Sequence, residues 1–434
     1  MDLKSIENIV SLCKRRGFIF QSSEIYGGLG STWDYGPYGV EMKQKIKDFW
    51  WHDVVTSREN VVGMDAAILM HPKTWEASGH VSNFHDPLVD CKNCKARYRA
   101  DHVDLNKPCE RCGKKDWTEP RQFNLMFKTT IGPVEGSGEI TYLRPETAQG
   151  IFVNFMNVQN TSRQKLPFGI AQLGKAFRNE ITTGNFLFRT REFEQMELEF
   201  FIHPGENEKW LDYWCKERLN WFKKLGISPK KLRLRPHDKD ELAHYSTACF
   251  DVEYEFPFGW SELEGIADRG TFDLDQHNEY SGKKQQYFDP QTNERIIPAV
   301  VESSAGVDRT FLTCLVDAYC EEEVRDEKRI VLKLDPKIAP ITCAVFPLVK
   351  KDGLPEIAQK IVEDIRTKYS AFFDQGGSIG RRYRRQDEAG TPYGVTVDHQ
   401  TTEDGTVTLR DRDTMDQVRI STDNILSELQ SRIQ

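Results

Sequence analysis

The chain has 434 residues, of which 38% are hydrophobic and 29% are charged. At about 150 residues per domain this length predicts about three domains, and two or four are equally compatible with it. The composition excludes a disordered chain, a collagen-like repeat and a membrane-embedded body. We therefore expect a soluble globular protein that buries a sizeable core.

The charge balance and the N-terminal segment indicate the partners and the cellular location of the protein. Lys and Arg number 59 against 67 Asp and Glu, a net charge of -8 that argues against non-specific coating of nucleic acid but allows a local basic surface. The longest apolar run, residues 341–346, is far shorter than the roughly 18 residues of a membrane span. Charged side chains interrupt the first 24 residues, so no signal peptide is expected. We expect a cytoplasmic protein with no membrane partner.

Two amphipathic helices open the predicted fold. Apolar residues recur at helical spacing over residues 6–13, and Gly17 follows as a terminator. A glycine-rich stretch at 27–39 then leads to Pro37, a residue favoured in the first turn of a helix. Apolar residues recur again at helical spacing over residues 42–50. A turn therefore delivers Pro37 to the start of a second helix.

Two cysteine pairs with metal-ligand spacing follow. Cys91 and Cys94 are separated from Cys109 and Cys112 by fourteen residues, and each pair has the Cys-x2-Cys spacing. Four thiolates on two such turns suit tetrahedral Zn²⁺ with no open position, so we expect a structural zinc in a zinc-ribbon-like insert at residues 88–118. The alternative is two reduced thiol pairs in a flexible loop.

Strand and helix patterns alternate through the middle of the chain. Residues 186–201 have a period of two, which predicts an antiparallel strand with an apolar face and a polar face that forms the floor of a pocket. We expect a helix over 206–235, a strand over 249–256 and a helix over 307–319.

The C-terminal segment predicts a separate small domain. Residues 333–340 are polar and carry two prolines, which favours a domain boundary. Strand patterns then follow at 341–346, 395–397 and 407–409; helix patterns lie at 357–365 and after Thr422 or Asp423, either of which would cap the last helix. We expect a catalytic domain at 1–335 and an α/β domain at 336–434.

An arginine cluster stands out in this C-terminal segment. Residues 376–386 join a turn to Arg381, Arg382, Arg384 and Arg385. Arginines neutralise phosphates and stack on bases, so we predict an RNA contact to a single-stranded loop. The alternative is a basic helix that pairs with acidic neighbours such as Asp387 and Glu388.

The stretch from Phe177 to Phe193 is the most informative. Arg178 offers a fork of donors to a phosphate, and Phe193 offers a flat face for adenine. On its own, a surface hairpin with arginines is more often a solvated face. The stretch resembles motif 2 of the class II aminoacyl-tRNA synthetases, a hairpin that holds ATP. Gly-Val-Asp-Arg at 306–309 resembles motif 3, and Pro37 followed by a helix resembles motif 1, which builds the dimer interface.

Longer sequence words narrow the family. Tyr-Arg-Ala-Asp-His at 98–102, Leu-Arg-Pro-Glu-Thr-Ala-Gln at 143–149, Glu-Leu-Glu-Gly-Ile-Ala at 262–267 and Glu-Ser-Ser-Ala-Gly at 302–306 resemble the dimeric glycyl-tRNA synthetases over nearly the whole chain. Residues 390–398 resemble the anticodon-binding domain shared by glycyl-, histidyl-, prolyl- and threonyl-tRNA synthetases. The resemblance implies an α+β catalytic domain built on an antiparallel sheet, followed by a C-terminal α/β anticodon-binding domain.

The resemblance also implies a reaction and its partners. Glycine and ATP give glycyl-adenylate, and the glycyl group then passes to glycine tRNA, in a homodimer. Arg178 and Arg309 are the expected catalytic residues, at the α- and γ-phosphates, with Mg²⁺ held near Glu262. The implied ATP-binding residues are Arg178, Asn179, Glu180, Phe188, Arg189, Arg191, Phe193, Glu262, Leu263, Gly306 and Arg309. The implied glycine-binding residues are Arg99, Glu146, Phe193, Gln195, Glu197, Arg269, Glu302 and Ser304.

Three alternatives stay open on the sequence alone. Surface salt bridging is the usual fate of carboxylates such as Glu146 and Glu302. A synthetase-like accessory subunit that binds nucleic acid without catalysis would keep the fold, but it has no physical need for Arg178, Phe193 and Arg309 together with Glu302. A class II synthetase for another small amino acid, such as alanine or serine, is the third hypothesis.

Overall fold

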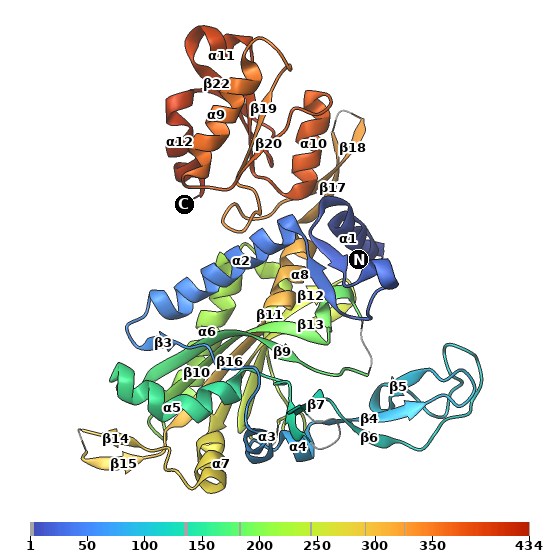
Figure 1. Cartoon of the computed structure of the whole chain (residues 1–434), viewed down its shortest axis with the longest axis vertical. Helices are drawn as coiled ribbons and strands as arrows, with labels where there is room; N and C mark the ends of the chain where they lie inside the picture. Colours follow the sequence, from blue (N-terminus) through green and yellow to red (C-terminus); the bar gives the residue numbers. More distant parts are fainter. Residues whose placement is uncertain are drawn as a thin grey trace.

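A large antiparallel sheet organises the N-terminal part of the molecule (Figure 1). The computed structural model describes residues 4–133, 138–181, 184–243, 245–290, 292–324 and 326–433, so Thr182 and Thr183 of the predicted hairpin loop lie outside it. The strands follow the order β11 (Leu232–Pro236), β12 (Ala248–Phe256), β13 (Gly259–Gly270), β16 (Ala299–Gly306), β10 (Glu192–Ile202), β9 (Phe168–Phe177) and β3 (Val61–Gly63). Neighbours are antiparallel except for the β3–β9 pair.

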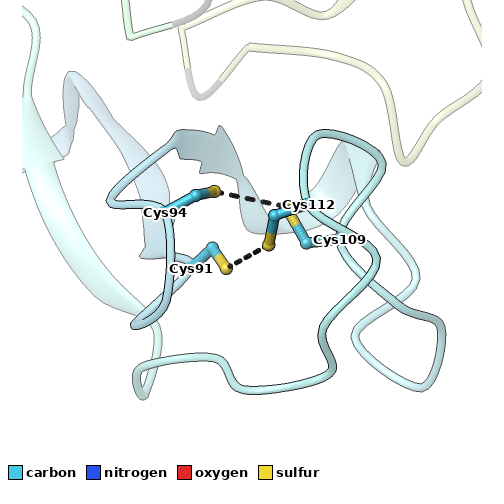
Figure 2. Close-up of side chains that lie close together, drawn as sticks. All are labelled: Cys91, Cys94, Cys109 and Cys112. Carbon is cyan, nitrogen blue, oxygen red and sulfur yellow. Dashed lines mark hydrogen bonds between the residues drawn. The ribbon is translucent and has the colours of Figure 1, made fainter.

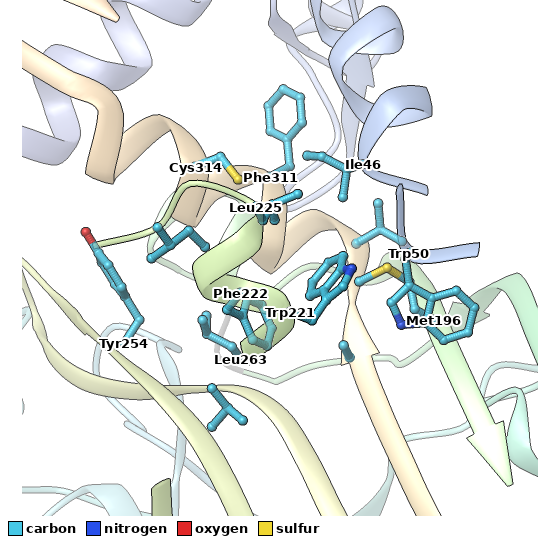
Figure 3. Close-up of a cluster of buried hydrophobic side chains, with 14 of the residues drawn as sticks. Ile46, Trp50, Met196, Trp221, Phe222, Leu225, Tyr254, Leu263, Phe311 and Cys314 are labelled. Carbon is cyan, nitrogen blue, oxygen red and sulfur yellow. The ribbon is translucent and has the colours of Figure 1, made fainter. Parts of the chain in front are cut away.

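Three helices cover one face of this sheet: α2 (Pro37–Trp51), α6 (Asn207–Lys224) and α8 (Val307–Ala318). Pro37 occupies the first turn of α2, where its missing N–H costs no hydrogen bond. Figure 3 shows Trp50, Trp221 and Phe311 from these helices packed above Met196 of β10. The N-terminal helix α1 (Lys4–Arg16) and the hairpin of β1 (Ile19–Gln21) and β2 (Trp33–Tyr35) extend this layer.

The opposite face is apolar at one end and polar at the other. At the apolar end Phe152 and Phe155 of α5 (Ala148–Ser162) pack on Phe168 and Phe201 of the sheet, next to α7 (Phe272–Ser281). Side chains alternate between the two faces of each strand. Farther along these strands, the residues on the same face as the phenylalanine cluster are polar. The polar end is therefore a recess framed by the N-terminus of α5.

Smaller sheets project from this body (Figure 1). The cysteine-rich segment forms β4 (His85–Asp90) flanked by β5 (Arg97–Arg99) and β6 (Arg121–Asn124). Two short helices, α3 (Pro72–Ala77) and α4 (His80–Asn83), precede it. Hairpins are formed by β7 (Lys128–Ile131) with β8 (Glu139–Tyr142), β14 (Tyr287–Asp289) with β15 (Glu294–Ile296), and β17 (Tyr319–Val324) with β18 (Glu327–Leu332).

The C-terminal part is built on its own sheet. Its strands lie in the order β20 (Ala371–Phe373), β19 (Cys343–Pro347), β21 (Tyr393–Val397), β22 (Thr406–Asp411) and β23 (Gln417–Ser421). The helices are α9 (Leu354–Arg366), α10 (Ile379–Ala389), α11 (His399–Asp404) and α12 (Ile425–Ile433). A separate apolar cluster joins α9 and α12 to this sheet.

Several predicted boundaries are wrong. Residues 186–188 form a 3-10 turn, and the strand begins at Glu192, because Asn185 and Phe186 adopt left-handed backbone angles. The predicted helix over 206–235 ends at Lys224, and residues 232–236 form β11. Neither Thr422 nor Asp423 caps the last helix: both lie in a 3-10 turn whose cap is the side chain of Ser421.

Candidate active site

A cavity of about 290 Å³ opens on the polar end of the sheet. The central strands contribute alternate residues to it: Phe193 and Gln195 from β10, and Glu302 and Ser304 from β16. Their neighbours Met196 and Ala305 face the helical layer instead. The alternation of a pleated strand thus separates the apolar core from the cavity wall.

Cationic groups converge at one end of this cavity. Arg178 follows β9; its Nε donates to the carbonyl of Pro145 at 3.0 Å, and its guanidinium lies 5.2 Å from the ring centre of Phe193. Arg309 stands in the first turn of α8, 4.4 Å from the ring of Phe188. It forms an ion pair of 3.1 Å with Glu262. A cation in this first turn opposes the helix dipole, and the carboxylate of Glu262 offsets that cost.

Carboxylates dominate the other end. Glu146 precedes α5, and its Oε2 lies 3.3 Å from His80 Nε2 while Gln149 donates to its Oε1 at 3.1 Å. Burial alone would raise the pKa of Glu146, but the contact with His80 and the charge of Arg269 hold the pKa well below its ordinary value. Glu146 is therefore an anion in this pocket, suited to an ammonium group.

Glu302 is held in place by a buried arginine. Arg269, 1% exposed, donates to Glu302 Oε2 at 2.5 Å and makes two hydrogen bonds of 2.7 and 2.9 Å to Asp273. Its guanidinium also lies 3.8 Å from the ring centre of Tyr245. Burial raises the pKa of Glu302 even though Arg269 opposes that shift. Arg269 thus positions the Glu302 carboxylate from behind.

Two further acids lie beneath the cavity floor. Glu197 and Glu199 on β10 are fully buried, and burial together with the nearby charge of Glu302 raises the pKa of each well above its ordinary value. Thr147 Oγ1 donates to Glu197 at 2.7 Å. Within the described part of the chain, neither carboxyl oxygen of Glu199 has a hydrogen-bond partner. The pKa of each acid is therefore shifted upward by its burial and by the neighbouring carboxylate.

The cavity brings together most of the residues expected from the sequence. Those that line it are Arg178, Glu180, Phe188, Arg189, Phe193, Glu262, Gly306 and Arg309 from the ATP set, and Glu146, Gln195, Glu302 and Ser304 from the glycine set. Gln195 joins two elements, since its amide donates to Ser304 Oγ at 3.2 Å and accepts from the backbone N–H of Thr147 at 3.1 Å.

Three expected ATP residues lie outside the described lining of the cavity. Leu263 points into the core under the helices, because a β-bulge between β12 and β13 shifts the register there. Arg191 donates to the carbonyls of Gly30 and Glu180, at 2.8 and 3.3 Å. The backbone N–H of Asn179 donates to the carbonyl of Leu125 at 2.7 Å.

Three expected glycine residues also lie outside that lining. Arg99 belongs to the cysteine-rich segment, where it pairs with Asp86 at 2.8 Å and Asp101 at 2.7 Å. Glu197 and Arg269 lie behind the wall, as described above. Arg269 contacts Glu302 of the cavity lining, and Glu197 accepts a hydrogen bond from Thr147.

The structure adds residues that sequence reasoning missed. His80, His237, Cys249 and Asp251 contact or line the cavity. Asp308 accepts hydrogen bonds from the backbone N–H of Glu194 and from the hydroxyl of Tyr35, and so fixes α8 to the sheet. His80 is 66 residues from Glu146 in the sequence, and no local pattern marks such a pair.

The four paired cysteines meet as their spacing predicts (Figure 2). Sγ of Cys91 lies 3.6 Å from Sγ of Cys112, and Sγ of Cys94 lies 3.7 Å from Sγ of Cys109. A tetrahedral Zn²⁺ with bonds of about 2.3 Å places its sulfurs about 3.8 Å apart, so the quartet fits this ion. Each pair forms the same turn: Cys91 O accepts from Lys95 N, and Cys109 O accepts from Gly113 N.

The arginine cluster of α10 divides between surface and interior. Arg381 is exposed and Arg384 is half-buried, while Arg385 pairs with Asp374 at 2.6 Å. Arg382 is 3% exposed and donates to the carbonyl of Pro347 at 2.6 Å. The guanidinium of Arg382 therefore serves the interior of the domain, and the tRNA contact of the cluster stays a prediction.

Comparison with known families assigns the class of protein. Residues 129–319 match the family described as tRNA synthetase class II core domain (G, H, P, S and T), and residues 342–432 match the family described as Anticodon binding domain. The antiparallel sheet, its cavity and the C-terminal α/β sheet are thus those of a class II aminoacyl-tRNA synthetase. Among the described residues, no helix is both long and apolar enough to cross a membrane.

Full-length relatives identify the family within that class. The chain is 55% identical over 439 aligned residues to the glycine–tRNA ligase of Treponema denticola, covering 99% of this chain and 97% of that protein. It is 56% identical to the glycine–tRNA ligase of Borreliella burgdorferi strain B31 and 54% identical to that of Caldanaerobacter subterraneus subsp. tengcongensis, each over 99% of this chain and 97% or 98% of the relative. The chain belongs to the glycine–tRNA ligase family.

Proposed function

We propose that this chain attaches glycine to glycine tRNA in two steps, through a glycyl-adenylate formed from glycine and ATP. One observation carries the proposal: Arg178, Glu302 and Arg309, which are far apart in sequence, line a single cavity with guanidinium groups at one end and carboxylates at the other. Glycyl-adenylate has the matching charge pattern, with an ammonium group at one end and a phosphate beside an adenosine at the other.

The cationic end suits the triphosphate. We propose that Arg178 binds the α-phosphate and Arg309 the γ-phosphate, since a planar guanidinium matches two phosphate oxygens at once. Phe193 offers its ring to adenine, and Glu180 lies on the same wall. Catalysis then depends on orienting the glycine carboxylate toward the α-phosphate and on stabilising the charge that develops there.

Mg²⁺ is the proposed cofactor of this end. Its preference for oxygen ligands fits the Glu262 carboxylate, which lies on the cavity wall 3.1 Å from Arg309. When bound, the ion would neutralise part of the charge of the triphosphate. Without it, the chain's own groups still orient the phosphates, because Arg178 and Arg309 are held by neighbouring rings and carbonyls.

The carboxylate end suits glycine, which can be recognised only through its two charged ends. We propose that Glu146, Glu302 and Ser304 receive the ammonium group. Gln195 is fixed between Ser304 and Thr147 and closes this part of the wall. We propose that Arg269 positions Glu302 and does not itself bind glycine, because its hydrogen bonds go to Glu302 and Asp273.

Three partners complete the proposal. We infer that the cysteine quartet holds a structural Zn²⁺, and that Arg381, Arg384 and Arg385 on α10 contact tRNA.

We also infer a homodimer, because apolar side chains stand exposed on and beside the motif 1 segment: Ile25 is 88% exposed, Tyr26 87% and Val40 51%. Sedimentation should give twice the mass of the chain. We also propose that the protein works in the cytoplasm, because tRNA is its proposed substrate.

Amino acid-dependent pyrophosphate exchange tests the function. We expect ATP–pyrophosphate exchange with glycine and a rate lower by at least about 100-fold with alanine or serine, because we propose that the glycine pocket excludes a side chain. Exchange with alanine or serine in place of glycine would identify another class II synthetase. The absence of exchange with every amino acid would leave the nucleic-acid-binding accessory subunit as the function.

A further inference from the structure

A second group of metal-binding side chains lies in the wall of the cavity, and the proposed reaction does not use it. His237 follows β11, and its backbone N–H donates to the carbonyl of Cys249 at 2.9 Å, so the β11–β12 pairing continues to this point. Cys249 and Asp251 are two residues apart on β12 and therefore face the same side. All three residues line the cavity.

The donor atoms of this group are close together. One nitrogen of His237, Sγ of Cys249 and one carboxylate oxygen of Asp251 lie within 4.8 Å of one another. His237 Nε2 is 2.8 Å from Asp251 Oδ2, so the imidazole and the carboxylate are already in contact. Tetrahedral Zn²⁺ separates such donors by roughly 3.3 to 3.8 Å, so the set lies close to the required spacing.

The side of the group that faces the cavity is open. Across from it on β13 are Gly265 and Ala267, which pair with Asp251 and Cys249. A methyl group built on Gly265 would come no closer than 4.0 Å to Asp251 Oδ1. An ion held by three protein ligands would thus keep a fourth position toward the cavity, as in sites that exchange their outer ligand.

We propose that His237, Cys249 and Asp251 form a transition-metal site, separate from the cysteine quartet, at which Zn²⁺ or an ion of similar softness binds inside the cavity and blocks adenylate formation. Imidazole, thiolate and carboxylate donors select such an ion over Mg²⁺, which prefers oxygen ligands only. The blocking effect rests on the proposed function, whereas metal binding does not.

Neighbouring groups make this site weaker than the cysteine quartet. The site has one thiol, Cys249, against the four thiols of the quartet. Arg235 Nη2 also donates a hydrogen bond to Asp251 Oδ2 at 3.1 Å, so an incoming ion competes with this contact. The site therefore fills only after the quartet is saturated, which suits an inhibitory site better than a structural one.

Equilibrium dialysis against Zn²⁺ tests the binding. The full-length protein and the control variant Cys320→Thr, whose cysteine lies on the β17–β18 hairpin, are expected to hold one more Zn²⁺ per chain than Cys249→Thr. Threonine is favoured in strands, and thermal unfolding checks that each variant is folded. His237→Gln should also bind one Zn²⁺ per chain fewer than the unmodified protein. If Cys249→Thr does not fold, His237→Gln is the variant that tests the site. Equal zinc contents in all folded variants would overturn the site.

Pyrophosphate exchange with added Zn²⁺ tests the blocking effect. Each variant is compared with its own rate without Zn²⁺. We expect the half-inhibitory concentration to rise at least about tenfold in Cys249→Thr relative to the protein and to Cys320→Thr, since even changes around a metal site typically cost 10- to 100-fold in affinity. Zinc bound in the cavity without inhibition would overturn the inhibitory role. A protein with no exchange activity would contradict the proposed function, and dialysis would still decide the metal site.

Discussion

At the scale of single residues, the environment of each charged group fits one end of the proposed ligand. Arg178 is held through Nε and between the rings of Phe84 and Phe193, with centroid distances of 5.4 and 5.2 Å. A guanidinium fixed in this way loses little conformational freedom when it binds a phosphate. Glu146 and Glu302 are fixed from behind by His80 and Arg269 in the same manner.

Replacement of Arg178 by alanine should remove most of the adenylation activity. Loss of one preorganised group that stabilises developing charge typically costs about 100- to 1000-fold in rate. We expect a loss of this size in glycine-dependent pyrophosphate exchange, and a change of at most a few degrees in the melting temperature. Arg295→Ala, on the exposed hairpin strand β15, is the matched control and should exchange normally. Unchanged exchange in Arg178→Ala would reject the assigned role.

The buried acid Glu199 should make the protein less stable at alkaline pH. Burial and the charge of Glu302 raise the pKa of Glu199 well above 4.5, so the folded chain holds this proton to a higher pH than the unfolded chain does. Stability therefore falls as pH rises above 4.5 toward the folded pKa, by up to about 1.4 kcal/mol per pH unit for one such group.

Substitution of Glu199 tests whether this carboxyl group makes stability fall as pH rises. Between about pH 6 and about pH 8 the melting temperature of Glu199→Gln should fall less than that of the unmodified protein, because a neutral amide has no proton to release. Glu356→Gln, at an exposed position of α9, should follow the unmodified protein. An equal fall in Glu199→Gln and in the unmodified protein would show that the buried carboxyl group is already ionised over this pH range.

At the scale of elements, the cysteine-rich segment depends on its quartet. Its strands β4, β5 and β6 enclose few apolar side chains apart from Leu88 and Val89. Removal of the metal by a chelator, or Cys109→Ser, should therefore unfold this segment locally while the central sheet stays folded. Limited proteolysis should then cut within residues 85–124, and the zinc content should fall below about one ion per chain. Protection from proteolysis without metal would contradict a zinc-dependent fold.

The arginines of α10 should contribute to tRNA binding but not to adenylation. Arg381→Ala combined with Arg384→Ala should lower kcat/KM for tRNA about tenfold, and should reduce the slope of its salt dependence by about one for each phosphate that is no longer neutralised. Exchange, which needs no tRNA, should not change. Lys360→Ala on α9 is the control in the same domain. An unchanged kcat/KM for tRNA would place the RNA-binding surface elsewhere.

Periodicity predicted the elements well where one pattern dominates a segment. The period of two in β10 correctly assigned Met196 to the core and Gln195 to the cavity, because pleating alone decides those faces. The alternation of leucine and arginine over 232–235 was an available strand signal that the helix prediction passed over. On α10, Arg382 shares the buried face with Gln386 at helical spacing, which composition alone does not reveal.

The remaining errors come from features that no local pattern encodes. The bulge at Val252 and Glu253 shifts the register of β13, so Leu263 turns to the core while Glu262 faces the cavity. Pairing of Arg269 with Glu302 and Asp273 depends on how β13, β16 and α7 meet in space. Motifs therefore pointed to residues around one cavity, and the tertiary fold decided which of them line it.

At the scale of the whole molecule, buried ion pairs join the cavity-bearing part to the C-terminal sheet. Arg329 on β18 donates to Asp387 of α10 at 2.9 Å and to the carbonyl of Arg412 at 2.6 Å. Arg16 of α1 pairs with Glu388 at 2.7 Å. Since β18 and α1 both pack beside the helical layer, the orientation of α10 is linked to the body that carries the cavity (Figure 1).

A crystal structure with a non-hydrolysable glycyl-adenylate analogue, such as glycyl-sulfamoyl-adenosine, tests the central claim most directly. The account predicts that the analogue lies in the cavity with its ammonium group within hydrogen-bond distance of Glu146 or Glu302 and its sulfamoyl group at Arg178. Binding outside this cavity, or with the ammonium group among the guanidinium groups, would contradict it.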